Sequence, residues 1–209
     1  MSSTDRKSHW DKVYGEKQPA EVSWFQARPA ISLEMIENAQ LAPDDPIIDV
    51  GGGASSLVDE LLAAGYADLT VLDVSGAALQ ASQHRLGDKA TSIHWVESDV
   101  TQFVVEGPFA LWHDRAVFHF LTDPADRRAY VAALKMALRP GGHLIIASFA
   151  IGGPEKCSGL PIVQYDADKL MAELGPDFRL VEQREETHIT PAQHTQAFAY
   201  FQLIRSPAG

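Results

Sequence analysis

Three consecutive glycines, from Gly51 to Gly53, follow an apolar run at residues 46–50 and precede a helical pattern that begins at Ser55. Glycines at the end of a strand allow a tight turn and let a ligand lie against bare backbone. The helix that follows presents unpaired N–H groups, which can bind a polar or anionic group. An acid, Asp49, stands two residues ahead of the first glycine. This segment therefore predicts a ligand-binding loop.

Acidic residues follow the next two apolar runs as well. Asp73 ends the second run, where a carboxylate can accept hydrogen bonds from both hydroxyls of a ribose. Asp99 follows the third run, where it could receive an adenine amino group or cap the turn that Thr101 continues. The fourth run ends in Asp114 and Arg115, which could face a substrate or pair with each other. Because the carboxyl ends of parallel strands meet at one edge of a sheet, these residues predict a nucleotide site.

The elements that must position these residues alternate along the middle of the chain. Strands are predicted from apolar runs at 46–50, 69–73, 92–96, 109–112 and 143–149. Helices are predicted between them at 55–64, 76–86 and 125–138, where apolar residues recur with helical spacing. This alternation predicts an α/β fold, a doubly wound and mostly parallel sheet with helices on both faces.

The two flanks differ from this repeat. Residues 1–45 predict one or two helices and include the aromatic residues Trp10, Trp24 and Phe25. After a Gly- and Pro-rich loop at 151–161, a helix is predicted at about 166–174. Two runs of alternating polarity, 178–188 and 193–205, then predict a β-hairpin on one side of the sheet.

Composition limits the class of protein. The chain has 209 residues, enough for one generous domain or two small ones, and we expect a single domain over 1–209. Its formal charge of −11 argues against a protein that holds nucleic acid mainly through phosphate contacts. One cysteine excludes an intramolecular disulfide. The polar beginning and the lack of a long apolar stretch predict a soluble, cytoplasmic protein that does not enter a membrane.

Two kinds of nucleotide site compete for the glycine loop. A dinucleotide-binding loop needs Gly-x-Gly-x-x-Gly, and the sixth position here is Ser56. Asp49 also fits that loop poorly. A nicotinamide oxidoreductase is therefore disfavoured.

The sequence resembles the class I S-adenosylmethionine-dependent methyltransferases. Residues 49–53 resemble the first motif of that family, with Gly51 and Gly53 at its two glycine positions. Residues 114–120 resemble the fourth motif, and residues 138–144 resemble the loop into the fifth strand. The resemblance implies a seven-stranded sheet with an antiparallel last strand beside the fifth. It implies cofactor contacts from Trp10, Tyr14, Trp24, Asp49, Gly51, Gly53, Ser55, Asp73, Val74, Asp99, Val100, Asp114 and Arg115.

The segment 1–45 resembles a lid found in several members of the family, whose aromatic residues close over the cofactor. Residues 46–150 would form the cofactor-binding half, and 151–209 the final helix and hairpin. The lid aromatics Trp10, Tyr14 and Trp24 could instead merely pack the first helix on the sheet.

The resemblance implies transfer of a methyl group by in-line displacement from the cofactor sulfonium, with S-adenosylhomocysteine as the product and no metal. Alignment of the nucleophile is the main requirement. A general base helps only when the acceptor must lose a proton. His119 is the candidate base, although its flanking residues Phe118 and Phe120 make a buried histidine at least as plausible.

The methyl acceptor stays open at this stage. An O, N or S nucleophile of a small molecule suits the compact chain, and a protein lysine is the alternative. A cofactor-binding module without catalysis is a third reading. The sequence leaves a monomer and a homodimer equally open, and we expect neither nucleic acid nor a membrane as a partner.

Overall fold

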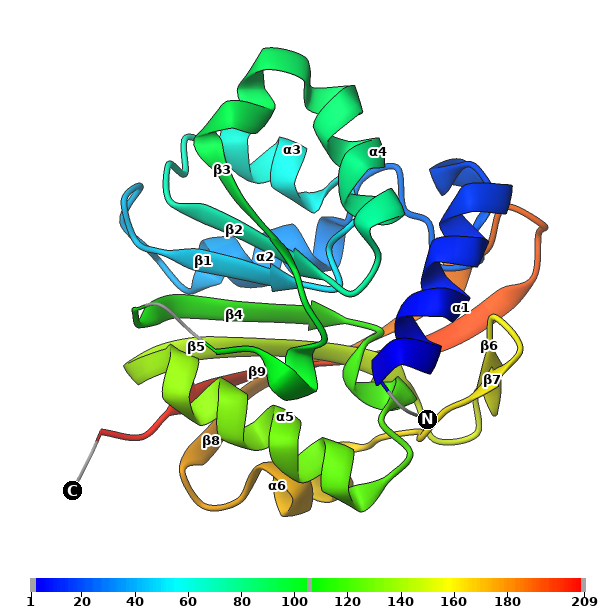
Figure 1. Ribbon diagram of the computed structural model, residues 1–209. Helices are drawn as coiled ribbons and strands as arrows, with labels where there is room; N and C mark the ends of the chain where they lie inside the picture. The colour runs from blue at the N-terminus through cyan, green and yellow to red at the C-terminus, as the bar shows by residue number, and fades with distance from the viewer. Residues whose placement is uncertain (1–2, 105–106, 208–209) are drawn as a thin grey trace.

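Seven strands form one mixed sheet in the computed structural model, which describes residues 3–104 and 107–207 (Figure 1). They are β1 (Ile47–Val50), β2 (Leu69–Asp73), β3 (Ile93–Glu97), β4 (Phe109–Arg115), β5 (Leu138–Phe149), β8 (Phe178–Ile189) and β9 (Thr195–Arg205). The order across the sheet is β3-β2-β1-β4-β5-β9-β8. Strands β1 to β5 are parallel, and β9 is antiparallel to both of its neighbours. This confirms the predicted fold, including the antiparallel last strand beside the fifth.

Helices cover both faces of the sheet and divide the core in two (Figure 1). Helices α2 (Ala30–Asn38), α3 (Leu57–Ala63) and α4 (Gly76–Leu86) pack on one face. Helices α5 (Pro124–Ala137) and α6 (Ala167–Leu174) pack on the other. Because successive residues of a strand point to opposite faces, Ile47 lies under the first group of helices and Ile48 under the second.

Local sequence fixes where these helices begin. The Ser75 hydroxyl accepts a hydrogen bond from the Ala78 N–H and so caps α4. Asp123 caps α5 in the same way, and Pro124 occupies its first turn, where a missing N–H costs nothing. Both helices consequently start within one residue of their predicted positions.

Two details differ from the sequence predictions. Strand β5 begins at Leu138 and includes residues 139–142, which predict a loop; a register shift against β4 and a positive φ of 76° at Gly141 accommodate them. The predicted loop at 151–161 contains a small hairpin of β6 (Lys156–Cys157) and β7 (Leu160–Pro161).

The first helix, α1 (Ser3–Glu16), crosses the edge of the sheet at which the strands β1, β2 and β4 end (Figure 1). Each of its residues keeps part of its surface exposed, although the Tyr14 hydroxyl is enclosed, so the position of α1 depends on contacts at the surface of the sheet and its helices. Four short 3-10 helices complete the described chain: η1 (Pro19–Glu21), η2 (Gly87–Ser92), η3 (Val100–Gln102) and η4 (Phe118–Phe120).

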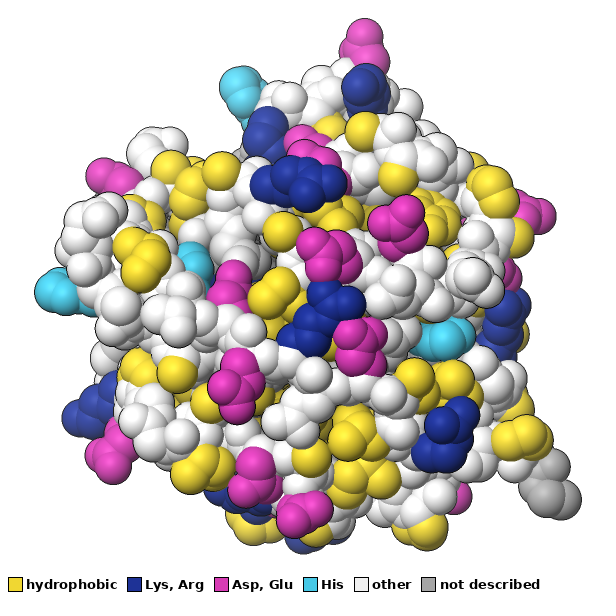
Figure 2. Space-filling model, turned by 180° about the vertical axis from the view of Figure 1, so that it is seen from behind, with side chains coloured by type: hydrophobic (Ala, Val, Ile, Leu, Met, Phe, Trp, Pro, Cys, Tyr) yellow, Lys and Arg dark blue, Asp and Glu magenta, His cyan; other side chains and the backbone are white. Residues whose placement is uncertain are grey.

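The face of the molecule shown in Figure 2 carries acidic and basic side chains next to one another. Ion pairs between exposed side chains, such as Lys12 with Glu16, also occur on α1. Although the net charge is −11, the acidic side chains on that face are therefore interspersed with basic ones.

Candidate functional site

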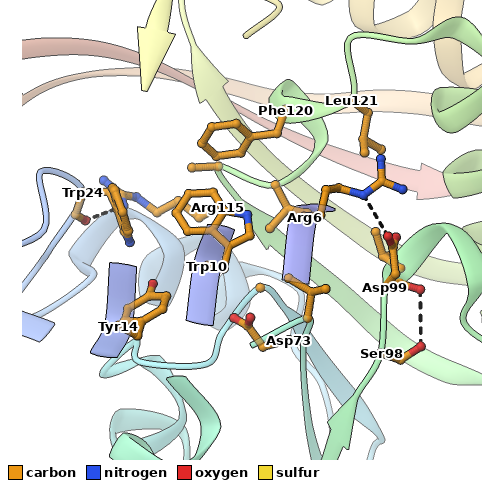
Figure 3. A pocket seen from close by; sticks show the side chains of 15 residues that line it. Arg6, Trp10, Tyr14, Trp24, Asp73, Ser98, Asp99, Arg115, Phe120 and Leu121 are labelled. Carbon is orange, nitrogen blue, oxygen red and sulfur yellow. Dashed lines mark hydrogen bonds and ion pairs between the residues drawn. The ribbon is translucent and has the colours of Figure 1, made fainter. Parts of the chain in front are cut away.

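A pocket of about 720 Å³, which includes space open to solvent, lies under α1 at the carboxyl ends of β1, β2 and β4 (Figure 3). Four segments predicted to meet there, those after β1, β2, β3 and β4, all contribute to its wall. The lining residues are Arg6, Trp10, Tyr14, Trp24, Gly51, Asp73, Val74, Ser98, Asp99, Val100, Arg115, Ala116, Val117, Phe120 and Leu121.

The glycine loop is shaped by close approaches that a side chain would block. Gly51 has a φ of 70°, and a Cβ at this position would collide with the Val117 side chain. A Cβ at Gly53 would lie 2.5 Å from Asp73 Oδ2. The Gly53 N–H instead donates to that oxygen at 3.0 Å, which ties the loop after β1 to the end of β2.

Asp73 is held rigidly at the pocket wall. Its carboxylate is 6% exposed and accepts a second hydrogen bond from the Ser75 N–H at 2.8 Å. Burial raises the pKa of Asp73 to about 6, with a smaller contribution from the neighbouring Asp49 charge, although the two backbone donors oppose the shift. Each carboxylate oxygen keeps a lone pair for a further donor.

Asp99 is already engaged by protein donors. Its Oδ1 accepts hydrogen bonds from the Thr101 N–H and hydroxyl, and its Oδ2 accepts one from Arg6 Nε at 2.8 Å (Figure 3). Burial alone would raise the pKa of Asp99, but these hydrogen bonds and the Arg6 charge hold it below its usual value. Arg6 also contacts Asp126 at 2.7 Å. Asp99 therefore caps η3 and anchors α1 at the same time.

One face of α1 forms the roof of the pocket. Arg6, Trp10 and Tyr14 are four residues apart and lie on the same side of the helix. The Trp10 ring contacts Trp24 and Phe120 edge-on, at centroid distances of 5.5 and 5.0 Å. Burial raises the pKa of the Tyr14 hydroxyl, which therefore stays protonated at neutral pH.

Asp114 and Arg115 face different ways and do not pair with each other. Asp114 is fully buried and accepts hydrogen bonds from Tyr130 Oη at 2.6 Å and from the Val117 N–H at 2.9 Å. Burial raises its pKa to about 6. Asp114 is not among the residues that line the pocket, so the predicted cofactor contact of this residue receives no support from its position.

Arg115, in contrast, lines the pocket and is held in place on three sides. Its Nε donates to Tyr200 Oη at 2.8 Å, and its Nη1 donates to the Trp24 carbonyl at 2.8 Å. Its guanidinium also lies over the Phe198 ring, 4.5 Å from the centroid. A partly buried cation held by three partners is thus present at the pocket wall.

His119 lies in the hydrophobic core next to the site. Its ring is 0% exposed, and neither nitrogen has a hydrogen-bond partner among the described residues. It contacts Phe120 and Phe149, and burial lowers its pKa to about 3. A neutral imidazole in this position does not line the pocket. The predicted role as a base stays a prediction, and the surroundings of the ring are those of a packing residue.

A second pocket of about 540 Å³, again including open space, adjoins the first. Tyr14, Trp24, Gly51 and Arg115 line both, so the two pockets meet at these residues. The other lining residues of the second pocket are Pro19, Val22, Phe25, Gln26, Pro29, Asp49, Gly52, Ala54, Ser55 and His113.

The region that builds this arrangement matches a known family. Residues 47–142, which include the glycine loop, Asp73 and Asp99, match the family described as "Methyltransferase domain". Residues 47–142 are therefore similar to a methyltransferase domain.

Relatives of this chain differ in what they are named for. Nodulation protein S of Rhizobium tropici is 39% identical over 124 residues, which are 59% of this chain and 51% of that protein. The chain thus spans about half the length of that relative. EEF1A lysine methyltransferase 2 of Danio rerio is 28% identical over 163 residues, 70% of each chain.

Solved structures of low identity share the fold of this chain. The N-methyltransferase NodS from Bradyrhizobium japonicum, in complex with S-adenosylhomocysteine, has a TM-score of 0.68 at 17% identity and covers 93% of this chain and 97% of its own. A second structure has a TM-score of 0.76 at 19% identity, and the match covers 97% of this chain and 93% of that one. Its title is "Conversion of a Disulfide Bond into a Thioacetal Group during Echinomycin Biosynthesis".

Most of the predicted site residues line one or both of the two pockets. Val74 and Val100 line the first, Asp49 and Ser55 line the second, and the lid aromatics line the first or both. Sequence reasoning missed Arg6, although its spacing from Trp10 and Tyr14 is a readable signal.

Two features are absent from residues 3–104 and 107–207. No group of three or more His, Cys, Asp or Glu side chains there could hold a metal ion. None of the described helices is long and apolar enough to cross a membrane.

Proposed function

We propose that the protein is an S-adenosylmethionine-dependent methyltransferase that transfers a methyl group to an oxygen, nitrogen or sulfur atom of a small molecule. The observation that carries the proposal is the convergence of Gly51, Asp73, Asp99 and Arg115 on one pocket. These residues come from the ends of four different strands, and open α/β sheets bind their ligands at this edge.

The main pocket fits the adenosine part of the cofactor. The Asp73 carboxylate, fixed by two backbone N–H groups, would accept hydrogen bonds from the two ribose hydroxyls. Val100 and Leu121 would supply apolar contacts for the adenine ring. Asp99 would contribute through its second Oδ2 lone pair or after exchange of Arg6.

The junction of the two pockets fits the sulfonium. Tyr14 and Trp24 line it, and aromatic faces attract cations. Asp49 and Asp73 lie close enough for the Asp49 charge to raise the Asp73 pKa, so two carboxylates lie near the junction. The amino-acid end of the cofactor would then occupy the second pocket, where Arg115 offers a cation for its carboxylate.

The bound cofactor supplies an electrophilic methyl group. The chain has to align the acceptor with the carbon–sulfur bond and keep water away. The aromatic cluster of Trp10, Trp24 and Phe120 roofs the pocket and would do both. Tyr14 keeps its proton and can donate a hydrogen bond at the junction.

A protein lysine is the second candidate acceptor, because a eukaryotic lysine methyltransferase matches 70% of the chain. We favour a small molecule because α1 closes over the pocket with three of its side chains. Labelled cofactor added to a cell lysate distinguishes the two. Label in low-molecular-mass products supports the proposal, and label confined to protein supports the alternative.

Calorimetry with S-adenosylhomocysteine tests the cofactor directly. We expect binding that Asp73→Ala weakens by about 1–3 kcal/mol, the range for lost hydrogen bonds to a charged group. Absence of binding at about 1 mM ligand refutes the proposal. A dissociation constant of that size corresponds to a binding free energy of only about 4 kcal/mol.

A further inference from the structure

Three buried polar side chains form a chain of hydrogen bonds at the second pocket. Asp49 of β1 lies 2.7 Å from His113 of β4, measured from Oδ1 to Nδ1. His113 Nε2 lies 2.9 Å from the hydroxyl of Ser32 on α2. The three residues are 4%, 3% and 0% exposed. Asp49 and His113 line the second pocket, and Ser32 stands behind them.

The fold itself brings these three side chains together. Strands β1 and β4 are parallel neighbours, and Asp49 is the register partner of His113. Both side chains therefore point to the same face of the sheet, which α2 covers with Met35 and Ile36. Ser32 lies one turn before these residues on the same helix.

The chemistry of the groups sets the direction of the hydrogen bonds. A carboxylate only accepts, so His113 Nδ1 donates to Asp49. In the neutral ring Nε2 is then an acceptor and receives the Ser32 hydroxyl proton. This chain of hydrogen bonds ends on Oδ1 of Asp49 and fixes the plane of the carboxylate.

The other oxygen of Asp49 has no such partner. Oδ2 is buried and accepts no hydrogen bond from any described residue. It lies against Gly52, where a Cβ would collide with it. Leaving a buried carboxylate oxygen without a donor is unfavourable, so the site calls for a donor supplied from outside the chain.

We propose that Ser32 and His113 are positioning residues, which hold Asp49 with Oδ2 ready to accept a hydrogen bond from the ammonium group at the amino-acid end of the cofactor. This inference rests on the proposed function. Asp49, Gly52 and His113 line the pocket in which that end would lie, and the ammonium is the charged donor that the buried oxygen lacks.

A pair of ligands separates this role from general support of the fold. S-adenosylhomocysteine carries the amino and carboxyl groups, whereas 5′-methylthioadenosine lacks both. Calorimetry with the two ligands is performed on the wild type, His113→Phe, His113→Asn and the control His143→Phe. His143 lies on β5, is half-buried and lines neither pocket.

We expect His113→Phe to weaken S-adenosylhomocysteine binding about tenfold or more, the effect of misplacing one charge-assisted hydrogen bond. Binding of 5′-methylthioadenosine should change by less than about twofold, within the scatter of distant substitutions. His113→Asn can still donate to Asp49 and should recover most of the affinity. His143→Phe should leave both affinities unchanged.

Gly52→Ala provides an independent variant, because its methyl group would displace Oδ2 without touching His113. It should show the same selective loss, and Ser32→Ala a smaller one. Equal losses for both ligands, or no loss in His113→Phe and Gly52→Ala, would overturn the inference. A wild type that binds neither ligand would overturn the proposed function and this inference with it.

Discussion

Acidification should weaken cofactor binding through a single carboxyl group. Asp73 is 6% exposed, and burial, followed by the charge of Asp49, raises its pKa to about 6. The ionised carboxylate offers acceptor sites on both oxygens for the two hydroxyls of a ribose, whereas protonation turns one of those sites into an O–H donor. Protonation of Asp73 therefore competes with ligand binding.

The size of the effect follows from that pKa. At about pH 7.5 Asp73 is almost wholly ionised, and at about pH 5 roughly one molecule in eleven is. The association constant for S-adenosylhomocysteine should therefore fall about tenfold between these pH values, which is roughly 1.4 kcal/mol. Calorimetry at constant ionic strength measures it.

Asp73→Asn is the matched variant, since its amide fills the same space and does not titrate. It should bind the ligand more weakly and lose the tenfold slope. Asp114 has a pKa of about 6 as well, and any slope that remains in Asp73→Asn reports that residue. Affinity that is flat down to pH 5 in the wild type, or equally steep in the variant, would refute the reasoning.

The same pKa has a consequence for folding. A carboxyl whose pKa rises from the usual 3.8 to about 6 on folding binds its proton more tightly in the folded state. Above about pH 6 its burial destabilises the ligand-free protein by roughly 3 kcal/mol, and this destabilisation disappears as the pH falls towards 3.8. The ionised Asp73 carboxylate at the pocket wall thus lowers the free energy of unfolding of the ligand-free protein.

Three further predictions concern neighbouring residues. Arg6→Ala should raise amide hydrogen exchange across residues 3–16 severalfold, because Arg6 joins α1 to Asp99 and Asp126; Lys12→Ala, at a side chain that is 73% exposed, is the control and should leave exchange unchanged. His119→Phe should leave ligand affinity intact. When the pH falls from about 6.5 to 5.5, urea denaturation should show that the variant loses roughly 1 kcal/mol less free energy of unfolding than the wild type. In the wild type the pKa of about 3 keeps the folded ring neutral while the unfolded ring protonates. Lost turnover with intact affinity would instead support His119 as the base. Arg115→Lys should lower the free energy of unfolding by about 1–3 kcal/mol, since lysine cannot bond Tyr200 and the Trp24 carbonyl together; unchanged stability would contradict that geometry.

The edge of the sheet that carries the site was predictable because strand ends carry a strong pattern. Apolar runs followed by Gly51, Asp73 and Asp99 can only be brought together if the runs are parallel neighbours, and the structure pairs them so. The contact between Gly53 and Asp73, twenty residues apart, is the direct result.

The orientation of residues at the end of β4 was harder to predict. Side chains of a strand alternate between faces, so His113 and Arg115 lie on one side and Asp114 on the other. The motif covers all three positions and does not indicate which of them face the pockets; Asp114 instead accepts a hydrogen bond from the buried Tyr130. The sequence also offered no partner for Arg6, because its contacts lie 93 and 120 residues further along the chain.

The distance along the chain between α1 and its anchors has a consequence for synthesis. The helix leaves the ribosome before β3, η3 and α5, which provide Asp99, Thr101 and Asp126 as its attachment points. A helix of this length is marginal in water by itself, and α1 has no buried residue to collapse around. Its ion pair with Asp126 can form only after more than half of the chain has been made. The attachment of α1 is thus completed only after elements far along the chain have formed.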